Sequence, residues 1–196
     1  MTLKNTVRLI EEDLGRVSKT RKGIIRMICL SPVLKFQILY RICSCLKKKS
    51  RICKILSIPI FVLYRHYRYK LGIEIELGTN IGGGWKLSHF QSITINGGAL
   101  IGRNCTIYND VTVGVSLYGQ CKVPRIGDNV VICCGARILG DVSVGNDCII
   151  GANAVVTHDV PDGCIAVGIP AKVIETNASQ KSHLWLKRGV NDTSVY

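Results

Sequence analysis

Several features of membrane-spanning, secreted and metal-binding proteins are missing from this sequence. No stretch approaches the roughly 18–20 uninterrupted apolar residues that cross a bilayer. The N-terminal segment carries the acidic run Glu11–Asp13, so we expect no signal peptide and a cytoplasmic location. The ten cysteines include no Cys-x-x-Cys pair. We therefore expect reduced, mostly buried thiols and no metal site.

Acidic residues are scarce in the first third of the chain. Residues 1–73 hold 17 Lys and Arg against 3 Asp and Glu, a net charge of +14, whereas the remainder holds 9 against 10. Basic helices gain about 1 kcal/mol per Lys or Arg beside anionic lipid, so peripheral contact with the inner face of the membrane is one interpretation. A solvated helical face explains the charge equally well. Nothing resembles a reading helix or a base-stacking platform, so we expect no nucleic-acid partner.

The first 72 residues have the spacing of α-helices. Apolar residues recur three and four positions apart between Val33 and Cys43, which is typical of a helix with one buried face. Ser31 followed by Pro32 predicts a helix start. The basic run 47–51 predicts a break, and the next helical run is expected to end near Gly72.

Beyond residue 72 the helical spacing gives way to a period of six. An aliphatic residue returns at every sixth position, namely Ile126, Ile132, Ile138, Val144, Ile150 and Val156. An earlier series starts at Ile75, shifts by two residues at Ile93 and then continues to Val113. A one-residue slip before Ile126 implies a protruding loop near 115–124. Gly, Asn and Asp are frequent and allow the positive φ angles of tight corners.

Six residues make a short strand and a turn, and three such units make one coil of a triangular prism. Each coil buries the apolar face of the next. The predicted fold class is therefore mainly β, a left-handed parallel β-helix of hexapeptide repeats preceded by an α-helical region. The expected divisions are 1–72 for the basic helices, 73–174 for the β-helix and 175–196 for a C-terminal tail.

The coil and the run Gly168–Lys172 that follows it resemble the hexapeptide-repeat acyltransferases, and more narrowly the serine acetyltransferase group. Glu12–Leu14, Leu87–His89 and Gly135–Gly140 match further motifs of that group. The resemblance covers most of the chain. It implies an enzyme that transfers an acetyl group from acetyl-CoA to a hydroxyl. It also implies a homotrimer or a dimer of trimers, with each active site between two subunits.

The resemblance assigns roles to single residues. His89 stands in the place of the catalytic histidine, which removes the proton of the acceptor hydroxyl. Glu74 stands in the place of the carboxylate that orients this histidine. Acetyl-CoA is expected along small and polar residues at the coil edge, which are Thr112, Gly114, Gly135, Ala136, Gly151, Ala154 and Lys172. Simple packing of the coil would explain the glycines and alanines equally well.

Three departures from the serine acetyltransferases concern the acceptor and partner. Ser88 stands where that group has its serine-binding aspartate, Lys122 and Val123 replace an Arg-His pair, and the last residue is Tyr196 instead of isoleucine. We therefore expect Ser88 and Lys122 to bind a sugar of an exopolysaccharide or capsule, as in the related polysaccharide O-acetyltransferases. L-Serine acetylation in cysteine biosynthesis is the alternative. A metal-dependent hydratase and a non-catalytic scaffold are two further, less favoured hypotheses.

Overall fold

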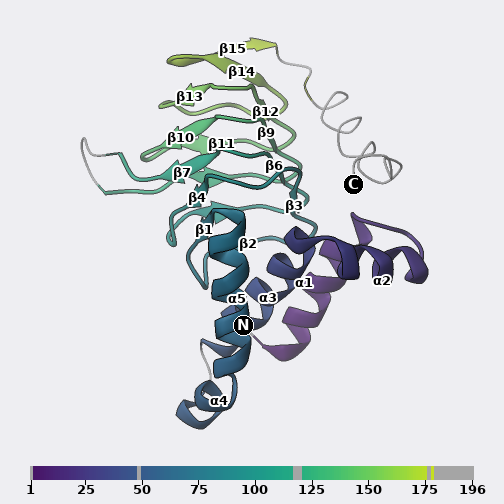
Figure 1. Ribbon diagram of the computed structural model, residues 1–196. Helices are drawn as coiled ribbons and strands as arrows, with labels where there is room; N and C mark the ends of the chain where they lie inside the picture. The colour runs from purple at the N-terminus through teal and green to yellow at the C-terminus, as the bar shows by residue number, and fades with distance from the viewer. Residues whose placement is uncertain (1, 48–49, 117–120, 176–177, 179–196) are drawn as a thin grey trace.

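The computed structural model describes residues 2–47, 50–116, 121–175 and 178. Helices gather at one end of the molecule and a stack of short strands rises from them (Figure 1). The helices are α1 (Leu3–Gly15), α2 (Arg21–Leu30), α3 (Pro32–Leu46), α4 (Arg51–Leu56) and α5 (Ile58–Leu71).

The helix boundaries follow the predicted signals. The Ser31 hydroxyl accepts a hydrogen bond from the Leu34 amide at 3.3 Å, and Pro32 is the first residue of α3. The gap between α3 and α4 falls in the basic run 47–51. Gly72 ends α5 with φ 59°, a left-handed conformation that a side chain disfavours. Among the described residues no single helix is long and apolar enough to cross a membrane, although α2 and α3, bent by 97°, pass that test as a pair.

The strands form three sheets that run along the prism. The first sheet contains β1 (Ile73–Ile75), β4 (Ile93–Ile95), β7 (Thr112–Gly114), β10 (Arg137–Leu139) and β13 (Val155–Val156). The second contains β2 (Asn80–Ile81), β5 (Leu100–Ile101), β8 (Arg125–Ile126) and β11 (Ser143–Val144). The third contains β3 (Lys86–Leu87), β6 (Thr106–Ile107), β9 (Val131–Ile132), β12 (Ile149–Ile150), β14 (Ile165–Gly168) and β15 (Ala171–Glu175).

Successive coils pair in parallel register, and only β14 and β15 pair antiparallel among the described strands. The aliphatic residues of the six-residue series are at most 4% exposed and fill the prism. Chain order along each sheet follows the coil, so this part is a parallel β-helix after an N-terminal helical region. The predicted fold class is confirmed. The expected tail, 175–196, lies almost wholly outside the described residues.

Strand pairing explains the two-residue shift in the repeat. Ile75 pairs with Ile95, which in turn pairs with Val113. The first of these coils therefore takes two residues more than the second. The six-residue period is unbroken from Ile75 to Leu87 in β3, whereas the inward residue of β4 that pairs with Val113 is Ile95. The two extra residues therefore lie in the corner between β3 and β4. This widened corner contains His89.

A buried ion pair joins the helices to the first coil. The Asp13 carboxylate of α1 accepts hydrogen bonds from Arg41 Nε of α3 at 2.9 Å and from the Gly84 amide at 2.8 Å. Trp85 Nε1 also donates to it at 3.1 Å. Arg41 Nη2 also donates to Asp13 at 3.2 Å, and the guanidinium donates to the backbone carbonyls of residues 81 and 82. Burial raises the pKa of Asp13, and these donors act against that shift.

The helices and the coil also share one apolar core. Phe36, Tyr40 and Tyr64 pack in the same cluster as the inward residues of the coil, and the rings of Phe36 and Tyr64 stack with centroids 5.6 Å apart. The Tyr64 hydroxyl donates to the Ile75 carbonyl at 3.0 Å. The helical region is therefore fixed to the start of the prism and closes that end.

Candidate active site

His89 lies in the widened corner where the chain leaves the third sheet and enters the first. In the later coils, the residues that follow β6, β9 and β12 occupy the same edge of the prism as His89. Backbone hydrogen bonds hold this column, with the Ser88 amide donating to Ile107 O at 3.0 Å and the Tyr108 amide donating to Ile132 O at 3.0 Å. His89 itself is exposed, so its ring is accessible to a substrate.

The side chains beside His89 are Tyr108 and Ser88. The His89 and Tyr108 rings lie 5.8 Å apart, tilted by 46°. Burial raises the pKa of Tyr108, and a hydrogen bond with the Ser88 side chain acts in the opposite direction. The phenol therefore stays protonated at neutral pH. No motif in the sequence indicates Tyr108, because only the pairing of Leu87 with Ile107 places it directly above Ser88.

The widened corner carries backbone conformations that L residues rarely adopt. Gln91 has φ 92° and Ser92 has φ 54°. One hydrogen bond ties the turn to the next coil, because the Asp110 amide donates to Gln91 O at 2.9 Å. Conformations of this kind persist where the surroundings impose them, and they gather at functional sites. Among the described corners between the third and first sheets, Asp110 and Asn153 also have φ 56°, but only this corner has two such residues in succession.

Glu74, the predicted partner of His89, lies in the middle of β1. Its carboxylate accepts a hydrogen bond from Arg68 Nη2 at 2.6 Å and is largely exposed. Within the described residues no hydrogen bond joins Glu74 to His89. The Glu74–His89 pair therefore stays a prediction. In this structure the Glu74 carboxylate pairs with Arg68 in the last turn of α5.

Thr112 and Arg137 are neighbours on the outer surface of the first sheet. Arg137 Nη2 donates to Asp110 Oδ1 at 2.9 Å, and its Nη1 donates to the backbone carbonyl of the same residue. Asp110 belongs to the corner next to His89. Arg137 therefore places a half-exposed cation between the widened corner, which contains His89, and the outer face of the first sheet. Arg137 lies within the motif Gly135–Gly140, which by itself indicates no separate role for this side chain.

The three predicted glycines differ in what a side chain would meet. Gly135 has φ 74°, and a Cβ there would collide with Asn153. A Cβ at Gly151 would lie 2.6 Å from Val167 Cγ1. The coil itself thus explains both. Gly114, by contrast, has a negative φ, and within the described residues no heavy atom apart from its chain neighbours lies within 4 Å of its Cβ position. The lack of a side chain at Gly114 leaves space for atoms that do not belong to the described residues, such as those of a ligand.

Among the other predicted coenzyme residues, two are buried and one lies at the far end of the third sheet. Ala136 and Ala154 are fully buried, so their side chains fill the prism and only their backbones could border a groove. Lys172 is exposed on β15, which pairs with β14 at the far end of the third sheet. The structure tests none of these assignments, and they stay predictions.

Lys122 lies on the other side of the first sheet from His89. It follows the loop between β7 and β8, whose residues 117–120 lie outside the description. Lys122 Nζ is 2.7 Å from Asp141 Oδ2, and Arg125 is 3.4 Å from the other oxygen. These cations lower the pKa of Asp141, with the hydrogen bond from Lys122 as the largest cause. One chain therefore does not bring Lys122 and Ser88 together.

The remaining histidines do not join His89. His158 is exposed in a corner between the first and second sheets, with Nδ1 3.0 Å from Thr157 Oγ1. His66 is exposed on α5 with its ring at the edge of Tyr67, and His183 lies outside the description. The part of the chain that is described contains no group of three His, Cys, Asp or Glu side chains able to hold a metal ion. All ten cysteines are free, and five of them are buried.

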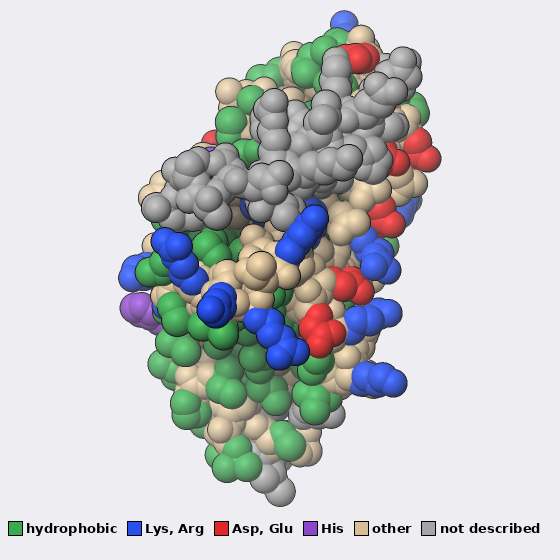
Figure 2. Space-filling view, turned by 90° about the vertical axis from the view of Figure 1, so that its right-hand side faces the viewer, with side chains coloured by type: hydrophobic (Ala, Val, Ile, Leu, Met, Phe, Trp, Pro, Cys, Tyr) green, Lys and Arg blue, Asp and Glu red, His purple; other side chains and the backbone are tan. Residues whose placement is uncertain are grey.

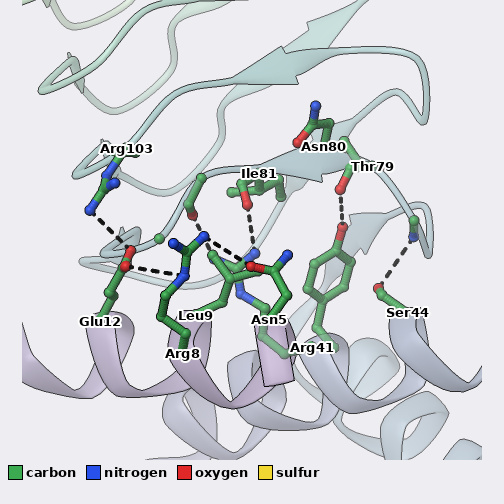
Figure 3. A pocket seen from close by; sticks show the side chains of 14 residues that line it. Asn5, Arg8, Leu9, Glu12, Arg41, Ser44, Thr79, Asn80, Ile81 and Arg103 are labelled. Carbon is green, nitrogen blue, oxygen red and sulfur yellow. Dashed lines mark hydrogen bonds and ion pairs between the residues drawn. The ribbon is translucent and has the colours of Figure 1, made fainter. Parts of the chain in front are cut away.

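A cavity lies between α1, α3 and the first two coils (Figure 3), and His89 is not among the residues that line it. Its charged side chains pair with one another, because Glu12 lies between Arg8 and Arg103, at 3.8 and 3.4 Å. Arg41 reaches past them to the Ile81 carbonyl at 2.6 Å. None of the predicted site residues lines this cavity. It is a feature of the junction between helices and coil.

The six-residue repeat and the parallel pairing of its strands identify the fold as a hexapeptide-repeat β-helix, with His89 in its widened corner. The family model "Bacterial transferase hexapeptide (six repeats)" matches residues 124–158. The chain is 40% identical over 108 residues to a serine acetyltransferase of Mycobacterium tuberculosis, which covers 55% of this chain and 47% of the relative. It is 43% identical over 108 residues to one of Helicobacter pylori, covering 55% and 63% respectively.

A solved structure agrees over a longer stretch. Soybean serine acetyltransferase in complex with serine superposes with a TM-score of 0.73 at 26% identity, covering 87% of this chain and 70% of that one. The chain spans about half to three-fifths of the curated relatives it matches. It is thus similar to serine acetyltransferases in the coil and in the whole fold. A capsule or polysaccharide branch has no support among these matches.

Proposed function

We propose that this protein is an O-acetyltransferase that moves an acetyl group from acetyl-CoA to an acceptor hydroxyl. The observation that carries the proposal is an exposed histidine, His89, in the widened and strained corner of a hexapeptide coil. The similarity to serine acetyltransferases over the same coil supports it. The division into residues 1–72, 73–174 and 175–196 and a cytoplasmic location remain expectations.

In the proposed reaction His89 acts as the general base. Its free ring nitrogen takes the proton of the acceptor hydroxyl while the oxygen attacks the thioester carbonyl. The carbon–sulfur bond then breaks, the ester forms, and the coenzyme leaves as a thiol after taking up the proton. Glu74 would orient the ring only if its carboxylate contacts His89 besides Arg68. Tyr108, protonated and 5.8 Å from the ring centroid, limits the space on one side.

The coenzyme site we propose runs along the outer face of the first sheet and its corners. Gly114 is the main support for this assignment, because none of the described residues occupies the space beside it. Thr112, Gly135 and Gly151 border the same surface, Ala136 and Ala154 contribute backbone, and Lys172 offers a charge for phosphate. Because Lys122 and His89 lie at opposite edges of this sheet, a complete site needs two chains. A homotrimer or a dimer of trimers supplies such a pair.

L-Serine is the acceptor that the comparisons favour. The curated relatives named above are serine acetyltransferases, and the soybean structure was solved with serine. This reverses the order expected from the sequence, where a sugar came first. We therefore propose L-serine as the first acceptor to be tested.

A sugar hydroxyl remains the second candidate because of one structural observation. The amino group of serine needs an anionic partner, and Ser88, where the serine acetyltransferases have aspartate, carries no charge. Asp110, in the adjacent corner, is already paired with Arg137, and Glu74, the predicted partner of His89, is paired with Arg68. A neutral sugar would need no such partner.

The decisive experiment follows acetyl-CoA consumption by thioester absorbance and identifies products by mass spectrometry. L-Serine is offered beside a panel of sugars and nucleotide sugars. His89→Ala should lower turnover by about two to four orders of magnitude, as expected for loss of a general base. Glu74→Gln should cost less, and no effect at all would remove Glu74 from the mechanism.

His158→Ala is the matched control, because His158 is also exposed in a corner of the coil but lies beside a different sheet edge. It should retain the turnover of the native chain. Near-native activity of His89→Ala, with normal folding, would contradict the mechanism. Acetylserine as the product assigns the first acceptor, and an acetylated sugar without serine turnover assigns the second.

A further inference from the structure

The end of the molecule opposite the β-helix carries an exposed apolar tip. We define the apolar tip as Ile55, Leu56, Ile58, Val62 and Leu63, on α4 and the first turns of α5. These side chains are between 47% and 77% exposed. Figure 1 places α4 at the far end of α5 from β1, so the tip projects away from the coil and from the candidate active site.

A basic and aromatic collar follows the tip along the same helix. Arg65, Tyr69 and Lys70 are exposed on α5, and the Arg65 guanidinium lies 5.8 Å from the Tyr69 ring centroid. The sequence contains no Asp or Glu from residue 14 to residue 73. Figure 2 shows hydrophobic side chains gathered over the helical end of the molecule, with Lys and Arg side chains and some Asp or Glu side chains along their border.

The order of these side chains matches the layers of a bilayer surface. With a rise of about 1.5 Å per residue, Ile58 to Leu63 span roughly 7.5 Å. Interfacial segments bury their apolar faces about 5–10 Å deep, at the boundary of headgroups and acyl chains. Arg65 and Tyr69 follow within the next turns. They would therefore lie at the depth of the lipid phosphates, where cations and tyrosine rings are favourable.

We propose that the apolar tip and its collar dock on an anionic membrane surface. A second copy of the same surface is a poor occupant, because two collars without carboxylates would repel each other. An anionic bilayer offers both an apolar layer and negative charge. In the trimer proposed above, the three tips would face the same way and bind together, which raises the apparent affinity. The docking itself does not depend on the acetyltransferase activity.

The test is co-sedimentation of the full chain with vesicles. Vesicles of phosphatidylcholine containing phosphatidylglycerol should bind the protein, and vesicles of phosphatidylcholine alone should bind it far less. Raising the salt to 1 M should weaken binding, because the Debye length falls to about 3 Å. The double variant Leu56→Ser/Val62→Ser should weaken binding about tenfold or more.

Ile174→Ser is the matched control, since Ile174 is 65% exposed on β15 at the other end of the molecule. It should bind vesicles as the native chain does. A separate variant, Val62→Trp, should show tryptophan quenching by brominated lipids beyond that of the native chain. This second measurement does not depend on the folding of the double variant.

Three results would overturn the proposal. The first is no binding to the anionic vesicles. The second is equal binding by the double variant and the native chain, with no quenching of Val62→Trp. The third is light scattering in which the double variant forms a smaller assembly than the native chain, because the tip would then be an interface between copies. Each result is independent of acetyl transfer, so a failed activity assay does not decide the question.

Discussion

Gly114 ends β7 and Gly135 precedes β10, the strand that pairs with β7, and the two are glycines for different reasons. Gly135 has a positive φ and faces Asn153, whereas none of the described residues lies beside Gly114. Gly114→Leu should therefore leave the melting temperature unchanged and raise the KM for acetyl-CoA at least about tenfold, if the side chain fills the coenzyme site. Steady-state kinetics with varied acetyl-CoA, together with a thermal melt, measure both effects.

Gly135→Ala provides the contrasting case. A left-handed conformation costs an L residue about 1–2 kcal/mol, so this variant should lose stability. An unchanged KM in Gly114→Leu would show that the coenzyme does not lie beside β7. A large fall in its melting temperature would show instead that protein atoms fill this space in the assembled protein.

His89 and Tyr108 illustrate what single residues reveal in the sequence. The place of His89 was predicted from a motif, and the two-residue shift near it was visible in the repeat. Tyr108 was not predicted, because its proximity to Ser88 depends on the register of β3 with β6. The register follows from the length of each coil, and this length is not constant along the chain.

At the scale of elements, the buried pair Asp13–Arg41 fixes α1 and α3 to the first coil. The two side chains are 4% and 2% exposed. Asp13→Ala would leave Arg41 as an unpaired buried cation and would free the Gly84 amide and the Trp85 ring nitrogen. We expect a loss of about 3–5 kcal/mol in the free energy of unfolding, measured by urea denaturation.

Glu12→Ala is the control for this pair. Glu12 precedes Asp13 on the same helix, and its partners Arg8 and Arg103 are more than half exposed. Exposed ion pairs contribute about 0–1 kcal/mol, so this variant should unfold nearly as the native chain does. Equal losses in the two variants would mean that the buried pair does not hold the junction.

The elements were predictable to different degrees. The period of six identified the inward residues of the coil, because every sixth side chain must fill the prism. Ser31, Pro32 and Gly72 set the helix ends through local backbone chemistry. The contact of Asp13 with Arg41, Gly84 and Trp85 was not predictable, because it joins segments 28 to 72 positions apart. No local pattern encodes such a contact.

At the scale of the whole molecule, the distribution of site residues determines how many chains a site needs. His89 lies where the third sheet meets the first, and Lys122 lies where the first meets the second. A site that uses both must therefore take them from neighbouring prisms. This arrangement is the physical basis of the trimer that we propose, and it can be tested without a structure of the assembly.

The test is complementation between two inactive variants. His89→Ala and Lys122→Ala should each have little activity as pure proteins. When they are unfolded, mixed in equal amounts and refolded together, a shared site receives His89 from one chain and Lys122 from its neighbour. Random assembly of a ring restores about a quarter of the sites, so the mixture should regain roughly that share of native turnover. The same two proteins refolded separately and then combined are the control. If the co-refolded mixture is no more active than this control, the site lies within one chain and Lys122 acts elsewhere.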